Sequence, residues 1–184
     1  MVFSYRFEKK STTMTFLAPE NLRKVAYWTV FISALITYGL TVEPSVSFWD
    51  SGEYISTSAK LQVGHPPGAP LFQIIGAFAA SFAFGNAEKV ALMVNGVSVV
   101  SSALTILLSF LIIEILILRW ERKNSDEVNP YRSIIASSVG ALALCFSDSF
   151  WFNAVETEVY AMASLVMALL LYLGLRWVAD DTPQ

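Results

Sequence analysis

The chain has 184 residues, of which 55% are hydrophobic, 14% aromatic and 15% charged. Soluble domains carry about 25% charged residues, so this composition excludes an ordinary soluble globular domain and is typical of a membrane protein. The net charge is only -3 and the basic residues form no patch that would bind nucleic acid, so we expect no nucleic-acid partner. The single cysteine, Cys145, excludes an internal disulfide.

Apolar runs alternate with polar loops along the chain. Residues 1–22 are mixed and basic, and we interpret them as a cytosolic tail. The segment 43–66 is too polar to cross a bilayer. The apolar runs predict an all-α polytopic membrane protein whose spanning helices cover about 25–42, 90–118, 133–149 and 159–178.

The run over 67–84 requires a separate decision, because it contains Pro70 and Gly76 and could either span the membrane or lie along its surface. Basic residues concentrate in cytosolic loops. A spanning helix here would divide the twelve basic residues of the chain evenly, six inside and six outside, whereas a surface helix leaves only Lys60 and Lys89 outside. We therefore predict four spans, a cytosolic N-terminus, and a first extracytoplasmic loop over 43–89 that carries two juxtamembrane helices.

The stretch FWDSGEYISTSAKLQVGHPPG, residues 48–68, holds the candidate catalytic residues Asp50 and Glu53. In one interpretation they form a variant capping box, with Asp50 as N-cap and Glu53 at N3 of a helix over 51–63. In another, Asp50 lies at a partly dry edge of the bilayer and acts as a general base. The two interpretations are compatible.

Two residues of the same stretch are candidates for binding substrate. His65, in the motif GHPPG, could donate to a phosphate or ligate a metal, although a lone histidine is more often structural. Its spacing matches no standard metal motif, so we assign no metal site and no cofactor, and a divalent metal stays an alternative. Lys60 could pair with a lipid phosphate or be a solvated lysine.

A second polar segment follows the third predicted span and contains Glu156 and Glu158. One of these carboxylates could simply complement the dipole of the last helix. The four-span topology places both on the same side as Asp50. The aromatic residues Trp49 and Tyr160 could belong to an interfacial belt or line a groove for a lipid carrier or a sugar.

Three segments carry a resemblance: TVEPSVSFWDSGEYISTSAKLQVGHPPGAPLF, VALMVNGVSVVSSALTILL and SFWFNAVETEVYAM. Together they resemble the N-terminal part of a bacterial membrane-protein family of unknown function. That family is similar to the eukaryotic transmembrane protein O-mannosyltransferases and is grouped with the GT-C glycosyltransferases. The resemblance covers about residues 20–180.

The resemblance implies an enzyme that transfers a sugar, mannose in the O-mannosyltransferases, from a polyprenyl-phosphate carrier to a protein or peptide hydroxyl outside the cytosol. It implies that Asp50, with Glu53 beside it, is the base or acceptor-binding group, and that Glu156 and Glu158 belong to the family's second polar element. GT-C enzymes have more spans, so we expect this chain to be the N-terminal piece of a longer protein of the bacterial inner membrane.

Two other classes of function stay open from the sequence. The chain could be a non-catalytic membrane subunit that scaffolds a partner enzyme or presents lipid to it. It could also be a small transporter, which is the weaker alternative because its acidic residues lie at the ends of the predicted spans rather than near mid-membrane.

Overall fold

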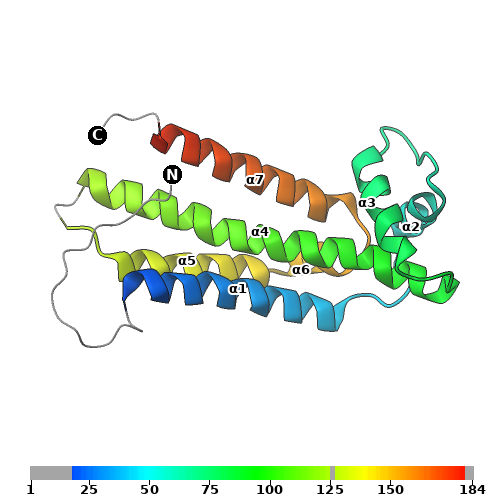
Figure 1. Ribbon diagram of the computed structural model, residues 1–184, viewed down its shortest axis with the longest axis horizontal. Helices are drawn as coiled ribbons and strands as arrows, with labels where there is room; N and C mark the ends of the chain where they lie inside the picture. Colours follow the sequence, from blue (N-terminus) through cyan, green and yellow to red (C-terminus); the bar gives the residue numbers. More distant parts are fainter. Residues whose placement is uncertain (1–17, 125–126, 181–184) are drawn as a thin grey trace.

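The computed structural model describes residues 18–124 and 127–180, which are helices and connecting segments without a β-strand in those ranges (Figure 1). This confirms the predicted all-α class. Residues 1–17 of the expected cytosolic tail lie outside the described ranges. The helices are α1 (Pro19–Thr41), α2 (Ser51–Lys60), α3 (Pro70–Ser81), α4 (Ala87–Asn124), α5 (Pro130–Cys145), α6 (Asp148–Val155) and α7 (Val159–Asp180).

The central element is α4, which runs the length of the molecule (Figure 1). Its 38 residues rise about 57 Å, more than the ~30 Å of a hydrocarbon core. It begins before and ends after the predicted span 90–118. α1 and α5 pack along one side of it and α7 along another, while α2 and α3 gather at one end (Figure 1). That end carries the candidate site.

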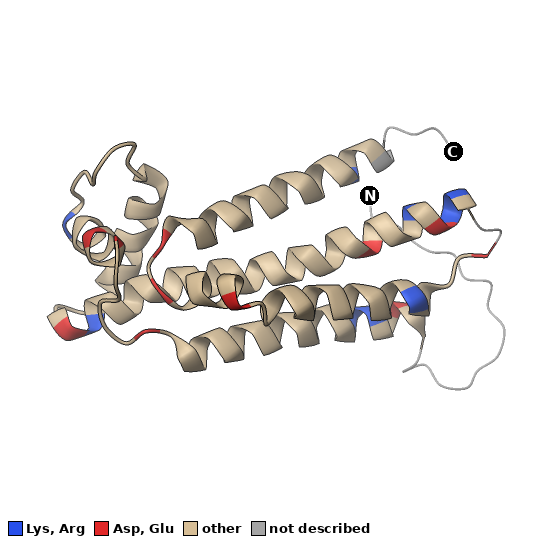
Figure 2. Ribbon diagram, turned by 180° about the vertical axis from the view of Figure 1, so that it is seen from behind, with Lys and Arg blue, Asp and Glu red and all other residues tan. Residues whose placement is uncertain are grey.

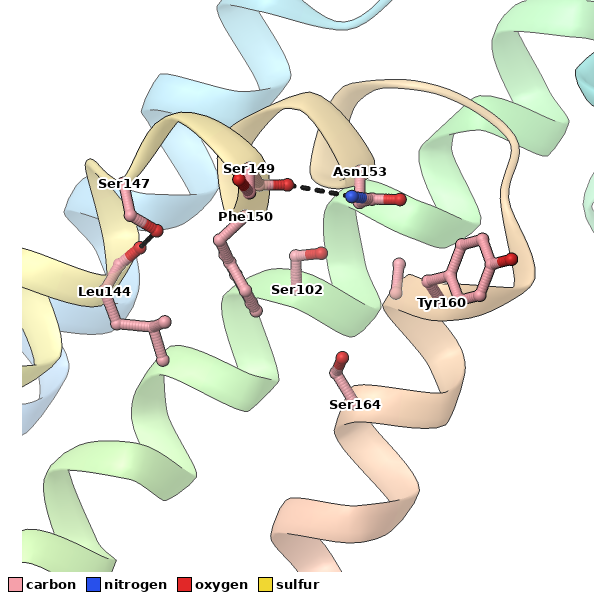
Figure 3. Close-up of a pocket in the computed structure, with 9 residues that line it drawn as sticks. Ser102, Leu144, Ser147, Ser149, Phe150, Asn153, Tyr160 and Ser164 are labelled. Carbon is pink, nitrogen blue, oxygen red and sulfur yellow. Dashed lines mark hydrogen bonds between the residues drawn. The ribbon is translucent and has the colours of Figure 1, made fainter. Parts of the chain in front are cut away.

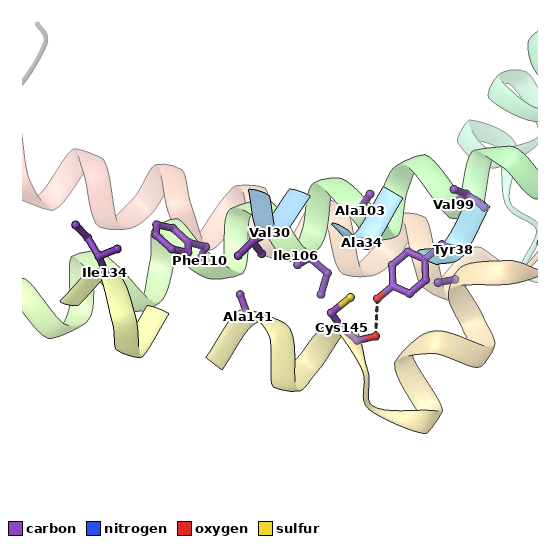
Figure 4. Packing of buried hydrophobic residues seen from close by; sticks show 11 residues of the cluster. Val30, Ala34, Tyr38, Val99, Ala103, Ile106, Phe110, Ile134, Ala141 and Cys145 are labelled. Carbon is purple, nitrogen blue, oxygen red and sulfur yellow. Dashed lines mark hydrogen bonds between the residues drawn. The ribbon is translucent and has the colours of Figure 1, made fainter. Parts of the chain in front are cut away.

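The largest buried cluster lies between α1, α4 and α5 (Figure 4). Ala34, Ala103 and Ala141 are fully buried where these helices meet, and such small side chains allow helix backbones to approach closely. Ile106 and Phe110 of α4 fill the space between them. Lipid tails are as apolar as the helix surface, so the hydrophobic effect does not drive helices together in a bilayer. Close packing of this kind fixes the helix positions instead.

Charged residues lie toward the two ends of the bundle, and the middle of the long helices is almost free of them (Figure 2). At the end opposite α2, the Arg23 Nε lies 2.7 Å from the Glu114 carboxylate and joins α1 to α4. Arg119 donates to the carbonyl oxygen of Leu175, which joins α4 to α7. Basic side chains thus hold that end together.

The helix expected over 133–149 is interrupted. α5 ends at Cys145, and α6 starts at Asp148 after a bend of 64°. The break leaves the Cys145 carbonyl without a partner from its own helix, and the Tyr38 hydroxyl of α1 donates to it at 2.8 Å (Figure 4). Tyr38 is fully buried, so this bond replaces a helical one in a dry environment.

Within the described ranges, α4 and α7 are long and apolar enough to cross a membrane, and α5 with α6 makes a third span if the bent pair is taken as one. α1 is not in this set, because the charged residues of its first turns, together with Thr, Ser and Tyr side chains farther along, lower its mean hydropathy. α3 has 12 residues and rises only about 18 Å, which is too short to span.

Candidate active site

The segment between α1 and α2 is fastened to α4 and to the end of α6. The Glu43 amide donates to the carbonyl oxygen of Val155 at 2.9 Å. Asn95 of α4 is fully buried and donates from Nδ2 to the carbonyl oxygens of Glu43 (2.6 Å) and Ser45 (3.0 Å). Its Oδ1 accepts a hydrogen bond from the hydroxyl of Thr157. One amide side chain therefore holds together the loops before α2 and before α7.

This connection brings the second acidic segment to the end of the bundle where α2 lies. Glu156 and Glu158 flank Thr157, and both are buried, with 3% and 7% of their surface exposed. The hydroxyl of Ser47 donates to Glu156 Oε2. Residues more than a hundred positions apart in the sequence thus belong to one site.

Asp50 stands at the start of α2. The residue before it, Trp49, has a φ of 59°, a left-handed conformation that is uncommon outside glycine and that turns the chain into the helix. Asp50 occupies the N-cap position, but its side chain makes no capping hydrogen bond. Its carboxylate is 59% exposed. The capping-box interpretation is wrong for this side chain, and the carboxylate is available to a substrate.

Glu53 binds His65 rather than the start of α2. Its Oε1 accepts the His65 backbone amide at 2.6 Å, and its Oε2 lies 2.9 Å from Nδ1 of the ring. Gly64 permits this approach, because a Cβ there would lie 3.1 Å from Glu53 Oε1 and 3.2 Å from Nε2 of Gln73. The second half of the capping box is therefore also absent, and Glu53 instead anchors the GHPPG turn on α2.

The imidazole of His65 stands between two carboxylates. With Nδ1 directed to Glu53, Nε2 faces Asp50, whose Oδ2 lies 3.9 Å away. The hydrogen bonds from His65 hold the pKa of Glu53 below its usual range, and Glu53, followed by Asp50, raises the pKa of His65. A protonated His65 would be the one positive charge in direct contact with this part of the site, as far as the described residues show.

Tyr54 connects the exposed and buried acids. Burial raises the pKa of its phenol, and the charges of Glu158, Asp50 and Glu53 raise it further. The pKa of Glu158 is also raised, first by burial and then by Glu156 and Asp50. These mutual effects require that the groups lie within electrostatic range of one another. Asp50 thus has as its neighbour a buried carboxyl group whose pKa is raised.

We did not single out Tyr54 from the sequence, although a signal was present. It stands four residues after Asp50, and residues at i and i+4 share a helix face. Asn95 was likewise not expected at the site, because an asparagine in an apolar helix is usually explained by helix packing.

Ligand atoms of Asp50, Glu53 and His65 all lie within 4.8 Å of one another, so these three residues could hold a divalent cation. Both oxygens of Glu53 already contact His65, which leaves Nε2 of His65 and the Asp50 carboxylate directed to a common point. A third protein ligand would require Glu53 to release His65. The donor set therefore fits a cation only after rearrangement.

Of the remaining predicted residues, Trp49 directly precedes Asp50, while Lys60 and Tyr160 lie farther along the chain. Lys60 is exposed in the last turn of α2, about 15 Å along the helix from Asp50. The Trp49 side chain is 85% exposed. Tyr160, 63% exposed, lines a separate cavity of about 290 Å³ between α4, α6 and α7 (Figure 3). Roles for these three in substrate binding stay predictions.

Residues 50–184 match the family described as the protein O-mannosyl-transferase TMEM260 N-terminal domain. The chain is 30% identical over 145 residues to a Dictyostelium discoideum protein named protein O-mannosyl-transferase tmem260, a match that covers 79% of this chain and 16% of the relative. It is 30% identical over 150 residues to the Mus musculus protein of that name, covering 80% of this chain and 19% of the relative.

The chain thus spans less than a fifth of the length of these curated relatives. No solved structure matches it significantly. The expected similarity to protein O-mannosyltransferases is confirmed, while membership of the bacterial GT-C family stays a prediction. Because the family match covers residues 50–184, most of the sequence, this chain belongs to the TMEM260 N-terminal domain family.

Proposed function

We propose that the protein acts as a membrane glycosyltransferase, which transfers mannose from a polyprenyl-phosphate carrier to a protein hydroxyl on the extracytoplasmic side. Both curated relatives are named protein O-mannosyl-transferase. The observation that carries the proposal is the position of Asp50 at the end of an apolar helix bundle. Its carboxylate is 59% exposed and makes no capping hydrogen bond to α2. A group there can meet a lipid from the bilayer and a peptide from water.

In the proposed reaction, Asp50 accepts the proton of a serine or threonine hydroxyl. The hydroxyl oxygen forms a bond to the anomeric carbon while the bond from that carbon to the phosphate oxygen breaks, and its electron pair leaves with the lipid phosphate. General-base assistance of this kind contributes about 10²- to 10⁴-fold. Protonated His65, held in place by Glu53, supplies positive charge at the same end of the bundle.

We further propose four spans, namely α1, α4, the bent pair α5 and α6, and α7, with the N-terminus in the cytosol and residues 43–89 outside. The short α3 and the basic contacts of Arg23 and Arg119 at the opposite end of the bundle support this topology. GT-C membership and a bacterial inner-membrane location stay predictions from the sequence.

The catalytic role is tested with the full-length protein, mannosyl-phosphoryl-polyprenol and a serine- and threonine-containing peptide. Asp50→Asn should lower kcat by about 10²- to 10⁴-fold. Asp148→Asn, an exposed carboxylate at the start of α6, is the matched control and should leave kcat unchanged. Wild-type rates for Asp50→Asn would overturn the role of Asp50.

The non-catalytic alternative predicts another result. A scaffold or lipid-presenting subunit would transfer no mannose alone and would still support a partner enzyme after Asp50, Glu53 and Glu156 are all neutralised.

Topology is tested with cysteines at Lys60 and Asn124 in intact cells. Cys145 is fully buried and should contribute little labelling. A membrane-impermeant maleimide should label position 60 but not position 124. Labelling of position 124 from outside would refute the four-span arrangement.

A further inference from the structure

A cavity lies next to the acidic site but outside it, walled by α4, α6 and α7 (Figure 3). Its volume is about 290 Å³, close to the lower limit of ~300 Å³ for small-molecule pockets. Its wall on the α6 side exists because α5 ends at Cys145 and the chain turns by 64°. The bend therefore opens a space that a straight span would have closed.

Ser102 is one of several buried serines whose hydroxyls have no partner among the described residues, and among them it is the one that lines this cavity. Ser102 is 1% exposed, its Oγ has no hydrogen-bond partner among the described residues, and it lines the cavity. In Figure 3 this hydroxyl points into the space between α6 and α7. A buried hydroxyl without a partner is destabilising, so a polar ligand that bonded to it would recover that cost.

The other lining residues define the chemistry of the ligand. None of the described residues that line the cavity is charged, so an anionic phosphate would find no counter-charge there. Ser149 and Ser164 provide hydroxyls that both donate and accept, and the side-chain oxygen of Asn153 accepts, while its amide nitrogen already donates to the Ser149 carbonyl oxygen. Phe150 and Tyr160 add aromatic rings. A purely apolar lipid tail would leave the polar groups unsatisfied, whereas a neutral polyhydroxyl ring satisfies them.

The cavity and the acidic site share a segment of chain, because Tyr160, which lines the cavity, is two residues from Glu158 in the sequence.

We infer that this cavity binds the sugar ring of the donor, a single neutral monosaccharide unit, with Ser102 as a hydrogen-bonding partner and the carrier phosphate outside it. This inference rests on the proposed function, because it assigns a place to the sugar that the enzyme transfers. It adds residues of α4, α6 and α7 to a site otherwise built on α2 and the loops.

The test uses the full-length protein in lipid nanodiscs and measures the Kd of two probes, mannosyl-phosphoryl-polyprenol and the same polyprenyl phosphate without sugar. Ser164→Leu places a larger apolar side chain in the cavity from the half-buried side of α7. Ala163→Leu is the matched control, because Ala163 is its exposed neighbour and does not line the cavity. Ser102→Ala removes one hydroxyl without adding volume and guards against misfolding of the leucine variant.

Ser164→Leu should weaken binding of the mannosylated probe by about tenfold or more, which corresponds to 1.4 kcal/mol. Ser102→Ala should weaken it by about two- to tenfold. Ala163→Leu should change neither affinity, and all three variants should bind the sugar-free lipid as wild type does.

Wild-type affinities for both cavity variants would overturn the inference while leaving the proposed function intact. Equal weakening of both probes would also overturn it and would assign the cavity to the carrier. No binding of the mannosylated probe by the wild-type protein would contradict the proposed function as well.

Discussion

The three hydrogen bonds of Asn95 predict a large cost for a single substitution. Asn95→Leu keeps the side-chain size but removes two donations, to the Glu43 and Ser45 carbonyl oxygens, and one acceptance, from Thr157. A buried hydrogen bond contributes about 0.5–1.5 kcal/mol, so losing three should destabilise the protein by about 1.5–4.5 kcal/mol. The upper half of this range is expected, because Asn95 is fully buried and its former partners would stay dry.

The measurement is chemical unfolding in detergent micelles, followed by circular dichroism. Asn124→Leu is the matched control, since Asn124 is exposed and donates to the Trp120 carbonyl oxygen of its own helix. It should change the free energy of unfolding by less than about 0.5 kcal/mol.

Asn95→Leu should also lower mannosyl transfer, because the same bonds hold the segment of Glu158 beside that of Asp50. Activity should fall even where the variant is still folded. A variant with wild-type stability would show that the two loops are held by other contacts, and would refute this account of how the site is assembled.

Two further predictions concern the ion pairs. Glu53→Gln should lower the pKa of His65 toward its ordinary value of about 6.5, as measured by NMR of the only histidine in the chain, and an unchanged pKa would mean that the contact is not formed. The Glu53–His65 pair stabilises the GHPPG turn at pH values below the ordinary histidine pKa. Its contribution is lost as the pH rises through the raised pKa of His65. Arg23→Leu should destabilise the protein by about 3 kcal/mol, because it leaves the Glu114 carboxylate, 3% exposed, without its partner. Adding Glu114→Leu should restore most of that loss in the same unfolding assay, and a failure to do so would point to packing by Arg23 instead.

Helix existence and type could be predicted from the sequence, because apolar runs and polar loops alternate clearly. The boundaries were less accurate where a polar or bent segment continues a helix. α4 extends past 118 to Asn124, since charged residues are compatible with a helix that leaves the bilayer. The bend after Cys145 was not predicted, because it depends on a contact between distant residues. The freed Cys145 carbonyl is tolerated only with a hydrogen-bond partner, and that partner, Tyr38, is 107 residues away in the sequence.

The sequence named candidate site residues but not the contacts among them. Asp50 and Glu53 fit a local capping motif equally well, and only the folded chain shows that Glu53 turns to His65. The pairing depends on a close approach at Gly64. Glu156 was expected near Asp50 from the distribution of charge, but its burial and its bond from Ser47 depend on the tertiary fold.

The hydrogen bond from Tyr38 to the Cys145 carbonyl has a consequence for biogenesis. α5 can stop inside the bundle only when α1 is already beside it, since an unsatisfied carbonyl in lipid costs several kcal/mol. The bend between α5 and α6 therefore depends on α1, the least apolar of the long helices. In the proposed four-span topology, a nascent chain has to retain α1 in the membrane until α5 emerges, so the first helix would serve as an assembly template as well as an anchor.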